Sequence, residues 1–122
     1  MKVRKLAFDS TTEDGRQRAS LIYQGFLVGG NVANGQRSKG ADVIRREAGI
    51  MRKFRKIGSE LSDGSGILLK NESETFTVAL DVPQFELLVK YFESTPWATR
   101  LAIEIEDILD WLATLPIEES DG

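Results

Sequence analysis

The chain has 122 residues, of which 41% are hydrophobic and 29% are charged, and this fits a single globular domain. It contains no Cys and no His. These absences exclude Ser-His-Asp and Cys-His catalytic arrangements, ordinary zinc sites and the usual haem ligands. Catalysis by carboxylates, Lys or Tyr stays possible, but we expect a protein that is not an enzyme and that binds neither a metal nor a cofactor.

The net charge of −3 conceals a strong asymmetry along the chain. Residues 1–58 carry 13 Lys/Arg and 5 Asp/Glu, whereas residues 59–122 carry 3 and 14. Such halves either pair within the molecule or present two oppositely charged faces to partners. The longest apolar stretch, residues 21–28, is too short to cross a membrane, and no apolar run follows the basic start. We expect a cytoplasmic protein without membrane contact.

The first forty residues predict a strand, a turn, one ambiguous segment and a loop. Residues 3–8 alternate in part and predict a strand, and Asp14-Gly15 is a strong turn signal. Residues 18–28 fit either a strand or a short helix, of which we favour the helix. Residues 29–40 hold four glycines without apolar periodicity, so they are predicted to form a flexible loop. This loop lacks the Lys and Ser/Thr of a phosphate-binding P-loop.

Residues 41–57 have the clearest helical pattern. Seven apolar residues fall on one arc of the helical wheel: Val43, Ile44, Ala48, Ile50, Met51, Phe54 and Ile57. Five cations fall on the opposite arc, which we call the basic arc: Arg45, Arg46, Arg52, Lys53 and Lys56. Gly58 follows directly and is a natural C-cap.

The next segment predicts two strands and a capped helix. Residues 59–66 are a turn-rich link, and residues 67–69 and 75–80 predict short strands. Asp81 and Gln84 have the spacing of a capping box, which predicts a helix over residues 83–93. Its core stripe would contain Phe85, Leu88, Val89 and Phe92.

Thr95-Pro96 resembles a second helix start and predicts a last helix over residues 96–114. Its apolar residues follow a heptad spacing: Leu101, Ile105, Ile108, Leu112 and Leu115. Acidic residues cover the other side: Glu104, Glu106, Asp107 and Asp110. Pro116 ends the helix, and residues 117–122 are predicted to be a frayed acidic tail.

These elements predict a single α+β domain over residues 1–116. A small antiparallel sheet of two to four strands would pack against about three helices. The helices at 41–57 and 97–114 would build most of the core.

Two apolar residues of the last helix do not fit its amphipathic pattern. Ile103 falls among the acidic residues, and Trp111 lies at the edge of the apolar stripe. Trp is favoured at interfaces, so these two residues, with Glu104 and Asp107, are our candidate partner-binding patch. The alternative is that either side chain is covered by the helix at 83–93 or by the first strand.

Three segments together resemble a known group of proteins. They are "IRREAGIMRKFRKI", "FTVALDVPQFELLVKYFESTPW" and "LAIEIEDILDWL". They look like small, mostly uncharacterised proteins from the structural-gene regions of tailed bacteriophages. The matching residues are Phe85, Leu87, Leu88, Pro96, Trp97, Ala102 and Asp110. The resemblance implies a non-enzymatic role in particle assembly or in handling a host protein, in the host cytoplasm or in the virion, and it implies no catalytic residue.

The resulting functional hypothesis is a non-enzymatic, protein-binding assembly or adaptor factor. Its partner would be another protein or a second copy, since a heptad seam and two opposite charged faces can complement themselves. The rival hypothesis is a nucleic-acid-binding regulator that uses the basic arc on phosphates. The acidic overall balance, with a pI of about 5.0, disfavours this rival.

Overall fold

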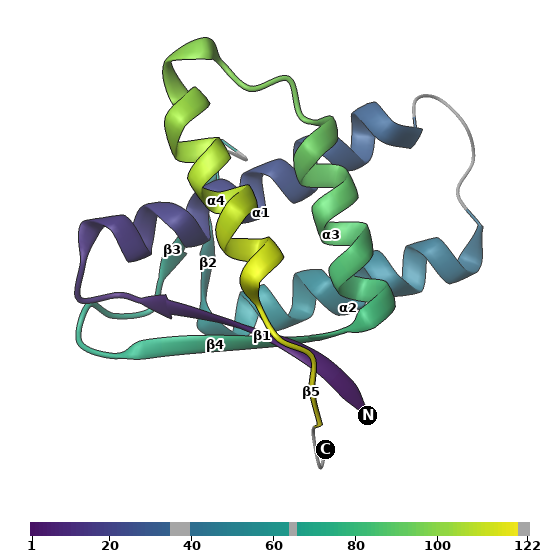
Figure 1. Ribbon diagram of the computed structural model, residues 1–122, viewed down its shortest axis with the longest axis horizontal. Coiled ribbons are helices and arrows are strands. Elements are labelled where there is room, and N and C mark those ends of the chain that lie inside the picture. Colours follow the sequence, from purple (N-terminus) through teal and green to yellow (C-terminus); the bar gives the residue numbers. More distant parts are fainter. Residues whose placement is uncertain (35–39, 64–65, 120–122) are drawn as a thin grey trace.

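The computed structural model of the protein describes residues 1–34, 40–63 and 66–119, and it has an α+β fold (Figure 1). Its helices are α1 (Glu13–Asn34), α2 (Ala41–Ile57), α3 (Val82–Ser94), the short 3-10 helix η1 (Thr99–Leu101) and α4 (Ala102–Thr114). Its strands are β1 (Lys2–Asp9), β2 (Gly58–Glu60), β3 (Ile67–Leu69), β4 (Thr75–Asp81) and β5 (Glu118–Glu119). The predicted fold class is therefore confirmed, with four α-helices in the described residues instead of about three.

The strands form two small antiparallel sheets. One has the order β4-β1-β5, and its register pairs Leu6 with Val78 and Phe8 with Phe76. Leu6, Phe8 and Val78 are all buried, which shows that this face of the sheet packs on the helices. The other sheet is the hairpin β2-β3. Glu118 and Glu119 belong to β5 and pair with β1, so the prediction of a frayed tail is wrong for these two residues. The last part of that predicted tail, residues 120–122, lies outside the described residues.

Helix α1 is the largest departure from the sequence-based prediction. It runs without a break from Glu13 to Asn34. The predicted turn at Asp14-Gly15 lies in its first turn, and the loop predicted from residue 29 is helical through residue 34. Residues 35–39 of that loop lie outside the described residues. The helix starts at Thr12, whose hydroxyl accepts a hydrogen bond from the Gly15 amide at 3.0 Å, as an N-cap side chain does.

Gly25 and Gly29 of α1 allow a close crossing with α3. A Cβ atom built on Gly29 would lie 1.6 Å from the Tyr91 carbonyl oxygen, and one on Gly25 would lie 2.6 Å from the Phe92 ring. Residues four apart share one face of a helix, so both glycines turn toward α3. Figure 1 shows α3 crossing α1 at this place. The absence of side chains there lets the two backbones approach each other.

Helices α2 and α3 follow the sequence-based prediction. α2 has the predicted bounds and buries Ile50, Phe54 and Ile57. α3 has the predicted capping box, in which the Gln84 amide donates to Asp81 Oδ1 at 2.8 Å and the Asp81 amide donates to Gln84 Oε1 at 3.1 Å. Gly58 does follow α2, but its φ of −169° is extended, because this residue already belongs to β2.

The start of α4 was predicted six residues too early. Thr95 ends α3 and does not begin the next helix, because its hydroxyl donates back to the Gly25 and Tyr91 carbonyl oxygens, at 2.8 and 3.0 Å. Trp97 then donates its indole N–H to the Phe92 carbonyl at 2.9 Å. These contacts hold the connecting segment against the end of α3, so α4 begins only at Ala102.

The heptad residues of α4 pack within the molecule's own hydrophobic core. Ile105, Ile108 and Leu112 are buried in the hydrophobic core, and Leu101 and Leu115 pack against it half-buried. This seam therefore does not remain available for a coiled-coil dimer. Within the described ranges, no helix is long and apolar enough to span a membrane.

Candidate functional site

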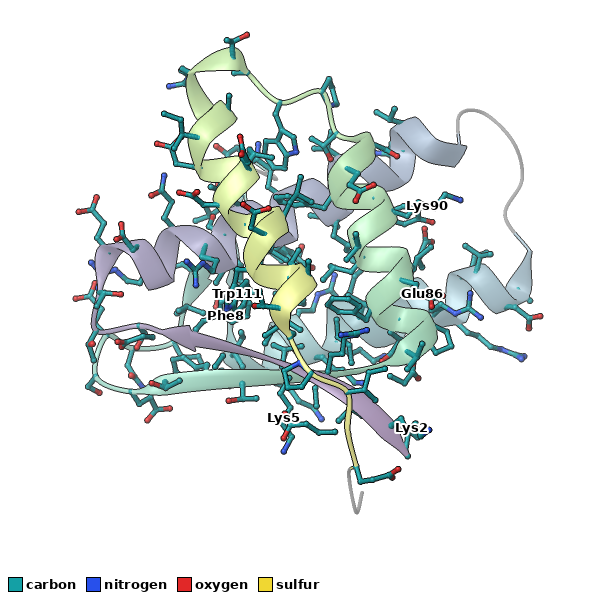
Figure 2. The ribbon with its side chains drawn as sticks, viewed as in Figure 1. Lys2, Lys5, Phe8, Glu86, Lys90 and Trp111 are labelled. Atoms are coloured by element: carbon teal, nitrogen blue, oxygen red, sulfur yellow. The ribbon has the colours of Figure 1, made fainter. Side chains whose placement is uncertain are left out.

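Trp111 connects α4 to the rest of the core. Its side chain is half-buried, and its ring centroid lies 6.0 Å from that of Phe8 in β1. Figure 2 shows the two labelled side chains next to each other between α4 and β1. The guanidinium carbon of Arg18 in α1 lies 4.6 Å from the centroid of the Trp111 ring, a cation–π contact. The first strand thus covers Trp111, as one of the two sequence-based interpretations expected.

Ile103 lies on the solvent side of α4. It is 75% exposed, the largest exposed fraction among the large hydrophobic side chains described. Because residues three and four apart share a helix face, Ile103, Asp107 and Asp110 form one exposed ridge. Glu104 and Glu106 flank this ridge, and all four carboxylates are exposed. We call this surface the α4 face. It places the predicted contact residues Ile103, Glu104 and Asp107 together. Trp111 lies four residues after Asp107 on the same side of α4, but it is half-buried against Phe8 and Arg18.

A hollow of about 150 Å³ lies beside the α4 face, between α4 and the first turns of α1. Its lining consists of Asp14, Gln17, Arg18, Leu21, Glu104, Asp107 and Ile108. Three of these residues are carboxylates. Cavities that bind small molecules usually have volumes of about 300–1,000 Å³, so this hollow has room for one inserted side chain instead. The sequence did not predict the α1 side of the hollow, because no helix was predicted at residues 14–17.

The basic arc of α2 is only partly available to a ligand. Lys53 is half-buried and donates to the Ala79 carbonyl at 2.6 Å and to Gln84 Oε1 at 2.7 Å. Its burial lowers the pKa of the Lys53 ammonium. Arg46 is half-buried as well. Arg45, Arg52 and Lys56 are exposed, and their spacings of seven and four place them on one ridge, which we call the α2 ridge.

Acidic groups accompany the N-terminal end of the basic arc. A surface hollow of about 300 Å³ contains Arg45 and Arg46 together with Asp42 and Asp81. Two carboxylates beside two guanidinium groups reduce the attraction of this place for phosphate. The C-terminal part of the α2 ridge, Arg52 and Lys56, does not line this hollow.

Tyr23, Arg55 and Glu60 form a second polar cluster, which joins α1, α2 and β2. The Tyr23 hydroxyl donates to Glu60 Oε1 at 2.6 Å, and Arg55 Nε donates to the same oxygen at 2.5 Å. Burial raises the pKa of Tyr23, and the hydrogen bonds from Tyr23 and Arg55 lower the pKa of Glu60. Since Tyr23 is fully buried, the cluster acts as a structural tie. In the described part of the chain, no group of three or more acidic side chains is placed to hold a metal ion.

Comparison with protein-family models, with curated proteins and with solved structures finds no match to this chain. The resemblance to tailed-phage proteins therefore stays a prediction from the residues alone.

Proposed function

We propose that this protein is a non-enzymatic protein-binding factor that contacts its partner through the α4 face. The observation that carries the proposal is the 75% exposure of Ile103 at the N-terminal end of a surface with four exposed carboxylates. A large apolar side chain gains free energy when a partner removes it from water. The surrounding carboxylates favour a basic partner and disfavour acidic ones.

The α1–α4 hollow supports the same proposal. Its size suits the end of one Lys or Arg side chain, and Asp14, Glu104 and Asp107 offer carboxylate oxygens to such a cation. An apolar contact at Ile103 beside a cation-accepting hollow would fit a protein surface better than a small metabolite. The likeness of three segments to proteins from tailed-phage structural-gene regions supports particle assembly, or the handling of a host protein, as the setting.

The experiment is a comparison of captured proteins. The wild type, Ile103→Asp and the double variant Glu104→Lys/Asp107→Lys are immobilised and exposed to a lysate of the source cells. We expect the wild type to retain a defined protein that both variants lose. Leu68→Asp is the matched control, because Leu68 is 60% exposed but lies on β3, away from α4. Equal retention by all four proteins would contradict the proposal.

Nucleic-acid binding through the α2 ridge is the second candidate, because Arg45, Arg52 and Lys56 are exposed. Three phosphate contacts predict that the logarithm of the binding constant falls with the logarithm of salt with a slope of about −2.7. Titration of double-stranded DNA at several salt concentrations measures this slope. Binding that follows the slope and is lost in Arg45→Glu/Arg52→Glu, but is kept in Ile103→Asp, would favour this candidate over the first.

A further inference from the structure

We infer that the α4 face binds the α2 ridge of a second copy of this chain, in a head-to-tail contact. This inference rests on the proposed function, and it identifies the protein partner as a second copy of the same chain. The two surfaces have opposite charges and are carried by the same molecule. One copy would offer Arg45, Arg52 and Lys56, and the other would offer Ile103 with its surrounding carboxylates.

The two surfaces turn away from each other within one molecule. In α2 the buried residues Ile50, Phe54 and Ile57 lie opposite the α2 ridge on the helix. In α4 the buried residues Ile105, Ile108 and Leu112 lie opposite Ile103. Both charged surfaces therefore face solvent, and Figure 1 shows α4 in front with α2, drawn fainter, behind it. The opposite charges can therefore meet between copies.

The two surfaces match over part of their length. Arg45 and Lys56 are eleven residues apart, which corresponds to about 16 Å along α2 at 1.5 Å per residue. The α4 face runs from Ile103 to Asp110, which corresponds to about 10 Å along α4. Arg52 and Lys56, about 6 Å apart along α2, therefore fit within the α4 face, and Arg45 extends past it.

The α1–α4 hollow provides a specific place for one cation of the partner. Its three carboxylates, Asp14, Glu104 and Asp107, share it with a single cation of the same chain, Arg18. The Arg18 guanidinium is held over the Trp111 ring. The hollow keeps an excess of two negative charges, and an arginine such as Arg52 of the second copy would neutralise one of them.

A head-to-tail contact has consequences for assembly. Each copy that uses its α4 face still presents its α2 ridge, so association continues into a chain unless the rotation closes a ring. Two helices in contact bury less than the roughly 800 Å² per partner of a standard stable interface, so a single contact should be weak. Since its charges are exposed, the association should weaken as salt rises.

The test is a charge exchange, measured as mass by sedimentation equilibrium over a range of concentrations at low salt. One variant, Arg45→Glu/Arg52→Glu, reverses the α2 ridge. The other, Glu104→Lys/Asp107→Lys, reverses the α4 face. We expect the wild-type mass to rise with concentration, and each variant alone to associate at least about tenfold more weakly, because it places like charges opposite each other. An equimolar mixture of the two variants should associate again, because opposite charges then meet at both surfaces.

Lys2→Glu/Lys5→Glu is the matched control for net charge. Both lysines are exposed on β1 and are labelled in Figure 2. This variant changes the net charge as much as reversal of the α2 ridge does, yet it leaves both proposed surfaces intact. It should therefore associate like the wild type. A loss of association in this control would show that net charge, and not the two surfaces, controls the mass, and would overturn the inference.

A wild type that stays monomeric at every concentration, or a mixture of folded variants that does not associate, would also overturn the inference. If one variant does not fold, Arg52→Glu/Lys56→Glu and Asp107→Lys/Asp110→Lys form a second pair with the same logic. The proposed function would survive a monomeric wild type if the lysate capture still depended on Ile103. Failure of the inference can thus be separated from failure of the proposed function.

Discussion

Gly29 of α1 lies directly against the backbone carbonyl of Tyr91 in α3, and a Cβ atom at Gly29 would approach that oxygen to 1.6 Å. This approach is far closer than non-bonded atoms allow. The crossing of α1 and α3 therefore depends on a hydrogen atom at this position. A carbonyl of a regular helix is part of the backbone, so it has little freedom to give way.

We expect Gly29→Ala to destabilise the fold by about 2–3 kcal/mol or more, as insertion of a methyl group into a tightly packed site does. Its gain in helix propensity of about 1 kcal/mol offsets only part of this cost. Urea unfolding followed by circular dichroism measures the change. Gly40→Ala is the control, because a Cβ atom at Gly40 has no neighbour within 4 Å. Equal stability of the two variants would contradict the described crossing.

Thr95→Val should reveal the polar tie at the same crossing. The buried Thr95 hydroxyl shares its proton between the Gly25 and Tyr91 carbonyl oxygens, and valine keeps the shape but not the hydroxyl. We expect a loss of about 1–2 kcal/mol in the free energy of unfolding. Ser94→Ala, which removes an exposed bond to the Lys90 carbonyl, should change it by less than about 0.5 kcal/mol. A larger loss in the Ser94 variant would contradict the assignment.

The tie between Tyr23 and Glu60 gives a pH-dependent prediction. The hydrogen bond lowers the pKa of Glu60 in the folded state, so its stabilisation is present above the unfolded pKa, near 4.5, and is lost as the pH falls through the lower folded value. Tyr23→Phe should raise the pKa of Glu60 toward 4.5 and reduce the stability at neutral pH by about 1 kcal/mol. Nuclear magnetic resonance titration of the Glu60 carboxyl measures the pKa. An unchanged value in Tyr23→Phe would show that the bond is not formed in solution.

Trp111 and Ile103 should differ sharply in their effect on stability. Trp111→Ala removes the contacts with Phe8 and Arg18, and we expect a loss of about 2–4 kcal/mol. Ile103→Asp changes an exposed residue and should alter stability by no more than about 0.5 kcal/mol. Thermal melting of both variants tests this difference. The reverse order of losses would mean that α4 packs on the core through its other face.

Local sequence signals were sufficient to predict the positions of two helices, α2 and α3. In α2, a long amphipathic pattern followed by Gly58 marked the helix and its end, and in α3 the Asp81–Gln84 capping box marked the start. The fold class followed from these helices and from the alternation in β1 and β4. For Ile103, the 75% exposure agrees with the interpretation as a surface residue and not with the alternative of a covered one.

The rest depended on contacts between segments far apart in the sequence. Glycine disfavours a helix by propensity, so a loop was predicted from Gly29 onward, and only the approach of α3 explains why Gly25 and Gly29 are needed within α1. Thr95 before a proline has the pattern of an N-cap, but its hydroxyl bonds to the preceding helix and to α1. The α1–α4 hollow requires both helices at once, so neither segment alone could predict it.

The pairing of β1 with β4 has a consequence for how the chain folds as it is made. β1 ends at Asp9, and its partner strand begins only at Thr75. Synthesis proceeds from the N-terminus, so the residues through β4 must emerge from the ribosome before this ladder can close, and closure of such a long loop has an entropic cost. Until then the first 58 residues, with 13 basic and 5 acidic side chains, emerge without the acidic half. We therefore expect that, during synthesis, a strongly cationic nascent segment lies close to the negatively charged ribosomal RNA.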